Sequence, residues 1–438
     1  MASEETPTMA PPSADPETPI RIETPAPRAW VIRLVMVGIV LAAVNLRPAI
    51  TSLGALLEEV RDGLGMSGSV AGLLTSVPPL CFAVFGVMAP RLAKRFGPST
   101  VVCAGMFAIA AGLVIRPFTG GTAGFLVASA LGLMGIAVSN VLMPVIVKRW
   151  FPDKVGSMTG LYSMALALGT STAAAATVPV TSALGGDWQA GLAVWAVLAV
   201  AAALAWLPLV GKKDTSTMAA AASPAAESAA ASEGSGLRIA RSRTAWALAV
   251  FFGLQATAAY ITMGWMAQIF RDSGVSASTA GVLLAVTMAM GIPLGFVIPR
   301  MAARLPSQGP MVIALGLCGL AGYAGLYFAP ASGAWAWALL LGISNCAFPL
   351  ALTMVGMRAR SGAGVAKLSA FAQSTGYLIS IPGPLLVGVL YQHSGGWGAP
   401  IALMAALMVP QIVVGVFAGR NRTVEDEAGA AAKAAPAS

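Results

Sequence analysis

Charged side chains are scarce in this sequence. Only 10% of its 438 residues are Asp, Glu, Lys or Arg, whereas 57% are hydrophobic and the mean hydropathy is +0.80. A soluble domain contains about 25% charged residues and roughly 45 to 50% apolar ones. The shortage of charge therefore excludes a soluble globular protein. Apolar runs of about 20 residues recur without a period of two, which predicts membrane-spanning helices instead of barrel strands.

Histidine, cysteine and deep carboxylates are also lacking. The sequence has one histidine, His393, and four cysteines that fall within apolar runs without metal-ligand spacing. Its 17 acidic residues lie in predicted tails, loops or span ends. An intramembrane enzyme would need an acidic metal cluster or a nucleophile with its base. We therefore expect no enzyme activity, no metal and no cofactor, and we interpret His393 as a solvated residue and not as a proton site.

Two low-complexity stretches divide the chain. Residues 1–28 are rich in Pro, Thr, Ala and Glu and predict a disordered tail without a signal peptide, and residues 211–243 predict a polar linker. We expect six-helix bundles at 29–210 and 244–419, followed by a tail at 420–438. The predicted spans cover residues 31–57, 69–90, 99–118, 122–147, 155–184, 188–210, 244–270, 276–299, 310–330, 333–357, 365–391 and 397–419.

Basic residues are distributed unequally between the two sides of the predicted membrane. Of 26 Lys and Arg residues, 22 fall in tails and alternate loops on one side, and only Arg61, Arg116 and Arg271 fall on the other. The positive-inside rule then places both termini in the cytoplasm, with the chain in the cell membrane. The net charge of +9 is thus a signal of topology, and we expect no nucleic acid partner.

The two halves repeat one another. Residues 65–96 and 274–305 align without a gap and share 12 identical positions in 32. A weaker similarity relates Asn140 and Pro144 to Asn345 and Pro349, which have the same spacing of four residues. Because each half has an even number of spans, the copies share one membrane orientation, which is a parallel repeat. This organisation is typical of transporters that rock two bundles about a central site.

Several motifs resemble one known family. Residues 45–52 read NLRPAITS, residues 71–78 read AGLLTSVP, and residues 251–255 read FFGLQ. With the basic stretch APRLAKRFG at 89–97, these resemble the cyanate and nitroimidazole permease branch of the major facilitator superfamily. The resemblance implies an all-helical carrier of twelve transmembrane helices in two bundles. It also implies a gating loop after the second span, with the basic residues Arg91, Lys94 and Arg95.

Two positions depart from the family pattern. Pro90 stands where the superfamily usually has an aspartate, which puts the carboxylate latch of the gating loop in doubt. Ala55 stands where a proline is expected in this branch, so the bend at the end of the first span is not predicted.

Arg47 carries the main functional hypothesis. At 1.5 Å per residue it lies roughly 24 Å beyond the start of the first span and about 15 Å before its end, well inside the hydrocarbon layer. An arginine at that depth costs about 2.5 to 3.5 kcal/mol and normally faces a cavity and a partner. No carboxylate is predicted at that depth. A small planar or carboxylate-like anion suits its fork of donors, and the alternative is a packing charge bonded to amides and carbonyls. Pro48 predicts that the helix opens beside it.

Other polar or aromatic residues near span centres are candidate substrate contacts. Each has an alternative as an interhelical hydrogen bond, and Trp265 has one as an interfacial residue. The candidates besides Arg47 are Asn45, Asn140, Tyr162, Gln255, Tyr260, Trp265, Asn345, Gln373 and Tyr377.

These observations favour a secondary carrier for a small anionic or polar nitrogen-containing solute, such as cyanate or a nitroimidazole, that works by alternating access. Its partners are then the solute and the lipid bilayer, and we expect a monomer. Two alternatives stay open, an efflux carrier for drug-like or other organic solutes and a non-transporting sensor on the same fold. The short tails and the linker offer no regulatory domain for a sensor.

Overall fold

The computed structural model describes residues 29–210 and 239–428, and these residues are helical throughout, with short connections. Twelve helical segments in this part of the chain are long and apolar enough to cross a membrane, which confirms the predicted number. The predicted tail at 1–28, most of the linker (211–238) and residues 429–438 lie outside the described residues. The predicted domain boundaries stay predictions.

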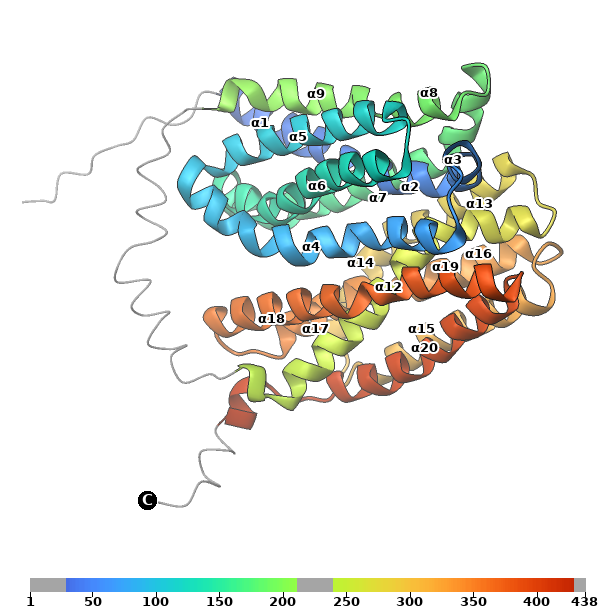
Figure 1. The fold of residues 1–438 in the computed structure, drawn as a ribbon. Coiled ribbons are helices and arrows are strands. Elements are labelled where there is room, and N and C mark those ends of the chain that lie inside the picture. Colours follow the sequence, from blue (N-terminus) through green and yellow to red (C-terminus); the bar gives the residue numbers. More distant parts are fainter. Residues whose placement is uncertain (1–28, 211–238, 429–438) are drawn as a thin grey trace, which may run out of the picture.

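The first six spans form one bundle, drawn in blue to green in Figure 1. Within it α5 packs against α6 and α9, and α1 packs against α7 and α9. Its elements are α1 (Ala29–Asn45), α2 (Pro48–Ala55), α3 (Leu57–Leu64), α4 (Gly68–Phe96), α5 (Pro98–Ile115), η1 (Arg116–Phe118), α6 (Thr122–Trp150), η2 (Pro152–Lys154), α7 (Val155–Ala183), α8 (Trp188–Ala193), α9 (Ala196–Trp206) and η3 (Leu207–Leu209).

The last six spans form the second bundle, drawn in yellow to red beside the first (Figure 1). The bundles meet where α4 packs on α19, α7 on α13 and α2 on α12. Its elements are η4 (Ile239–Arg241), α12 (Arg243–Asp272), α13 (Ala277–Ala289), α14 (Gly291–Arg304), α15 (Gly309–Phe328), α16 (Ala334–Asn345), α17 (Ala347–Met357), α18 (Gly362–Ser380), α19 (Pro382–Ser394) and α20 (Gly398–Ala418).

One predicted element differs from the structure. The predicted gating loop is not a loop, because Arg91, Lys94 and Arg95 lie in the last turns of α4, which runs to Phe96. The helix continues because a basic last turn is favourable at a helix C-terminus, and the glycine that ends it is Gly97, with φ of 85°. Inside the predicted linker, the described residues begin with η4 at Ile239.

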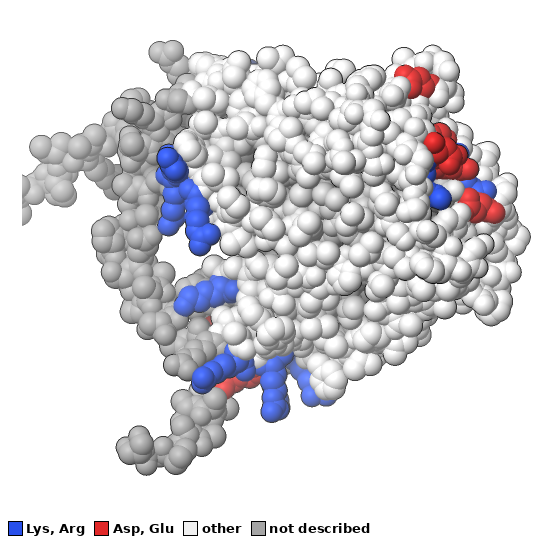
Figure 2. Space-filling model, viewed as in Figure 1, with Lys and Arg blue, Asp and Glu red and all other residues white. Residues whose placement is uncertain are grey.

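Basic side chains gather at one end of the molecule, and most of the acidic side chains in view gather at the other end with a few basic ones among them, as Figure 2 shows. We call the basic end the one formed by the C-termini of α4, α6 and α14, with Arg91, Lys148 and Arg300. We call the acidic end the opposite one, with Glu58 and Glu59 on α3 and with Asp187 and Asp272 at the ends of α8 and α12.

The segment after α20 packs back onto the basic end. Glu427 accepts hydrogen bonds from the hydroxyls of Ser242 and Thr244 at the start of α12, both at 2.7 Å. Burial alone would raise the pKa of Glu427, but the hydrogen bonds from Ser242 and Thr244 outweigh it and lower the pKa below the usual value. The charged form of Glu427 therefore ties the end of the described chain to the second bundle.

This contact predicts a pH-dependent effect of the Glu427→Gln substitution. Because the pKa of Glu427 is lower in the folded state, its contribution to stability is complete above the ordinary glutamate range and is lost as the pH falls through the folded-state value. At neutral pH we expect the free energy of unfolding to fall by about 1 kcal/mol, and we expect the difference to shrink in acid. Thermal unfolding at several pH values measures it, with exposed Asp153→Asn as the control. An effect that is constant with pH contradicts the assignment.

Candidate functional site

The first span is interrupted at its predicted functional residue. α1 ends at Asn45 and α2 begins at Pro48, so that Arg47 is the N-cap residue with φ of −120° and ψ of −26°. Pro48 cannot donate a backbone hydrogen bond, and it occupies the first helical position of α2, where none is required. The carbonyl of Arg47 accepts hydrogen bonds from the amides of Ile50 and Thr51. The break turns the chain at the depth where the bundles face each other.

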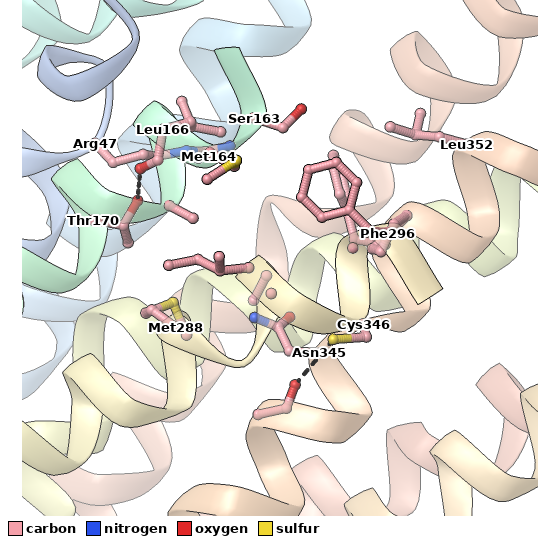
Figure 3. Close-up of a pocket in the computed structure, with 18 of the residues that line it drawn as sticks. Arg47, Ser163, Met164, Leu166, Thr170, Met288, Phe296, Asn345, Cys346 and Leu352 are labelled. Atoms are coloured by element: carbon pink, nitrogen blue, oxygen red, sulfur yellow. Dashed lines mark hydrogen bonds between the residues drawn. The ribbon is translucent and has the colours of Figure 1, made fainter. Parts of the chain in front are cut away.

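A cavity of about 530 Å³ lies between the two bundles. This is within the usual range for small-molecule sites, about 300 to 1,000 Å³. Its wall is largely apolar, with methionine side chains and Phe296 (Figure 3). Among the residues that the structure describes, Arg47 is the only charged residue in the wall.

The surroundings of Arg47 are aromatic. Its guanidinium carbon lies 5.9 Å from the centroid of the Phe82 ring, within the range of a cation–π contact. Phe82 stacks on Tyr377 with ring centroids 5.1 Å apart and also contacts Tyr260 across the bundle interface. Tyr260 and Tyr377 line the same cavity as Arg47. The positive charge thus faces the cavity amid tyrosine hydroxyls and not carboxylates.

Four of the ten predicted contact residues line the cavity together. They come from four different spans. Two of these spans have a break in the helix at the site, one at Arg47 and one between α16 and α17, directly after Asn345. These residues are Arg47, Tyr260, Asn345 and Tyr377.

The other six predicted contacts do not line the cavity, and several are committed to protein partners. The amide of Gln255 donates to Asn345 Oδ1 at 2.9 Å, and its oxygen accepts from Gln411. The hydroxyl of Tyr162 donates to Asn140 Oδ1 at 2.5 Å. These buried pairs join helices within each bundle, which is the interhelical alternative for these residues.

The remaining three occupy other positions. Asn45 is buried against Met106 in the first bundle. Gln373 donates to Ser369 one turn earlier in α18. Trp265 is fully buried, and its indole N–H donates to Thr75 Oγ1 at 3.1 Å across the bundle interface. It therefore packs between the two bundles and does not line the cavity.

The sequence reasoning missed a polar face on the fifth span. Thr159, Ser163 and Thr170 of α7 line the cavity, with the small residues Gly156 and Gly160 beside them (Figure 3 shows Ser163 and Thr170). The signal was present, because these residues recur at helical spacing along one face. Phe82 had no comparable signal, since one phenylalanine in an apolar run predicts only burial.

The cavity extends toward the basic end. Its wall reaches Gly156, the second residue of α7, and Pro299, which directly precedes Arg300. Ser163 is exposed and lies within the first three turns of α7. Solutes therefore approach Arg47 from the basic end in this conformation.

An ion-pair cluster closes the acidic end. Arg271 at the end of α12 donates to both carboxylate oxygens of Glu59 at 2.9 Å and lies 2.8 Å from Glu58. Beside it, Asp272 accepts from Tyr391 and Trp397. The Arg271 contacts join the two bundles, and the Asp272 contacts hold the ends of α12, α19 and α20 together.

Close backbone contacts lie beneath this cluster. A Cβ atom on Gly54 of α2 would lie 2.0 Å from the carbonyl oxygen of Met263 in α12, and one on Gly72 of α4 would lie 2.8 Å from that of Leu385 in α19. Glycine at both positions lets the helices touch, as small residues do between membrane helices. The acidic end is thus sealed by packing as well as by charge.

Twelve spans in two bundles around a central cavity, closed at one end, define a membrane carrier. The sequence profile of the Major Facilitator Superfamily matches residues 35–361, and the chain belongs to this family. It is a multi-pass secondary transporter and not an enzyme.

Curated relatives match over most of the chain. It is 33% identical over 389 residues to an uncharacterized transporter, YycB, of Bacillus subtilis, covering 88% of this chain and 94% of that protein. Identity is 32% over 401 residues with a 2-nitroimidazole transporter of Escherichia coli, with coverage of 90% and 97%. It is 30% over 378 residues with the cyanate transport protein CynX of the same organism, with coverage of 86% and 94%. These relatives confirm the predicted branch.

Solved structures match the fold. A crystal structure of the nucleoside transporter NupG has a TM-score of 0.69 at 13% identity and covers 89% of this chain and 98% of that one. A crystal structure of a D-xylose-proton symporter has a TM-score of 0.68 at 12% identity, with coverage of 90% and 98%. At such low identity the likeness concerns the fold alone.

Proposed function

We propose that this transporter carries a small anionic or polar nitrogen-containing solute, cyanate-like or nitroimidazole-like, with Arg47 as its anion contact. The observation that supports this is a single cation in a largely apolar cavity whose wall holds no carboxylate among the described residues. The names of two relatives, a 2-nitroimidazole transporter and a cyanate transport protein, point to the same solute class.

The other polar groups of the wall fit such a solute. Tyr260 and Tyr377 supply hydroxyls from the second bundle, and Asn345 supplies an amide. A small anion held by the Arg47 fork on one side meets neutral donors on the other. Contacts from both bundles are what a carrier needs, because the solute then favours their closure around it.

The charge distribution supports an orientation. We place the basic end in the cytoplasm, with both termini, because 22 of the 26 basic residues fall on that side of the predicted topology. The conformation described here is then inward-facing, and its closed acidic end faces the outside. We further assign the transporter as a monomer, since the cavity is complete within one chain.

Counterflow in proteoliposomes tests the solute class. Vesicles loaded with unlabelled cyanate or 2-nitroimidazole should accumulate the same labelled solute well above the level of protein-free vesicles, because a carrier exchanges solute across the membrane. Small anions of similar shape should compete, and sugars should not. If neither solute is exchanged by protein that unfolds cooperatively on heating, the proposed solute class is wrong.

A further inference from the structure

Arg116 is a second arginine buried within the spans. The sequence placed it on a water-facing flank, but at the end of the third span it is only 3% exposed. Its Nη1 donates to the carbonyl oxygen of Ala49 at 3.0 Å, and its guanidinium lies 5.8 Å from the Phe125 ring. Within the described part of the chain, its Nε and Nη2 have no hydrogen-bond partner. Burial of unpaired donors on a charged group is unfavourable, so these atoms require an explanation.

Arg358 shows how this chain satisfies a buried arginine that has a packing role. It is 2% exposed, and its Nε donates to the carbonyl oxygen of Ala418 at 3.0 Å. Its Nη2 donates to the carbonyl oxygen of Gly419 and to Gln308. The carbonyls of Ala418 and Gly419 lie at the C-terminus of α20, where a cation is favourable. Arg116 has only one such bond, so packing accounts for less of its side chain.

Arg116 lines a second, smaller cavity of about 20 Å³. Ser129 of α6 also lines this cavity, and its buried hydroxyl likewise has no partner among the described residues. Thr75 and Tyr260 complete its polar wall, and Tyr260 also lines the large cavity. The small cavity therefore lies on the same path as Arg47.

The small cavity lies on the acidic side of that path, where the bundles are in contact. Its wall includes Gly54 of α2 and Gly264 of α12, which meet beneath the Arg271 ion pairs. Separation of α12 from α2 and α4 would open this cavity toward the acidic end. The guanidinium of Arg116 also donates to the carbonyl oxygen of Ala49, which is two residues after Arg47 in the sequence.

We propose that Arg116 and Ser129 form an anion-binding site, the Arg116 site, which the solute meets before Arg47 when the acidic end opens. The inference rests on the proposed function, since it extends the anion path of the same carrier. Its ligand is a small anion with two acceptor atoms, because Nε and Nη2 are adjacent donors of one planar fork. No carboxylate lines either cavity among the described residues, so neither arginine is neutralised there by an acidic side chain.

Transport measured separately from each end tests the Arg116 site. Cyanate uptake is compared in right-side-out and inverted membrane vesicles. Labelling of Ser394→Cys, an exposed position where α19 ends, with an impermeant maleimide identifies the vesicles that present the acidic end. Arg116→Gln should raise KM at least roughly tenfold from the acidic end, because loss of one hydrogen bond from a charged group weakens binding roughly 10- to 150-fold. It should change KM from the basic end less than about twofold. Arg47→Gln should reduce transport from both ends.

Ser129→Ala is the second variant, because it leaves the bond from Arg116 to Ala49 in place. Loss of one neutral hydrogen bond should raise KM from the acidic end about threefold. Unchanged KM in both variants, or an equal change from both ends, overturns the proposal and makes Arg116 a packing residue.

Failure of the proposed function would give a different pattern. If wild-type protein does not transport cyanate, equilibrium binding of sodium cyanate and sodium thiocyanate decides the question. A roughly tenfold weaker affinity in Arg116→Gln, with Arg47→Gln unaffected, supports the Arg116 site without the proposed solute path. Equal affinities of wild type and Arg116→Gln overturn it.

Discussion

Arg47→Gln should reduce counterflow of an anionic solute at least about 30-fold, because truncation of one partner in a buried charge pair costs roughly 2 to 5 kcal/mol. The guanidinium is the only charged group in the wall of the large cavity among the described residues. Glutamine retains an amide but neither the charge nor the fork. Arg47→Lys keeps the charge without the fork and should fall between the two.

Stability separates solute binding from packing at this position. A buried arginine costs about 2.5 to 3.5 kcal/mol at membrane depth, so glutamine should leave the melting temperature of solute-free protein unchanged or higher. Cyanate should raise that temperature for wild type and not for the variant, since a ligand stabilises only the state it binds. Arg33→Gln, on the exposed face of the same helix α1, is the matched control. Normal counterflow by Arg47→Gln, or loss of transport together with loss of stability, contradicts the assignment.

The fold was predictable because its signals are local. A span is recognised from about 20 apolar residues, and the predicted first span, residues 31–57, differs from the observed Trp30–Ala55 by two residues or fewer at each end. The break before Pro48 was predictable from the chemistry of proline. The bend after Ala55 was not, because the expected proline is missing there, and the turn at Leu56 separates α2 from α3 nonetheless.

The site was less predictable, because a linear sequence does not show which face of a helix meets which neighbour. Gln255 and Asn345 both lie at membrane depth, yet only Asn345 lines the cavity. The side-chain amide of Gln255 instead forms hydrogen bonds with Asn345 and Gln411. Arg116 was assigned to a flank because it ends an apolar run, but the turn of η1 directs it back under α2. Such choices depend on packing between distant segments.

Gly54→Ala should shift the protein away from the conformation described here. The added methyl would lie 2.0 Å from the carbonyl oxygen of Met263, and both partners are backbone or directly attached to it. Overpacking of this kind typically costs about 1 to 3 kcal/mol, which changes a two-state population roughly 5- to 150-fold. Separation of α2 from α12 relieves the clash, so the acidic end should open. Alanine favours a helix over glycine by about 0.5 to 1 kcal/mol, so helix propensity alone would have the opposite effect on stability.

Two cysteine reporters measure this shift in a background that lacks the four native cysteines. Maleimide labelling of Ser163→Cys, in the cavity near the basic end, should fall in Gly54→Ala, and labelling of Ser69→Cys at the acidic end should rise. Counterflow should fall with it, because transport requires both ends to close in turn. Gly86→Ala is the matched control, since its added methyl would lie 3.7 Å from the Val141 side chain, an ordinary contact. If both reporters react as in the control, contact of α2 with α12 does not hold the acidic end closed, and the Arg271 ion pairs or the contact of α4 with α19 at Gly72 do so instead.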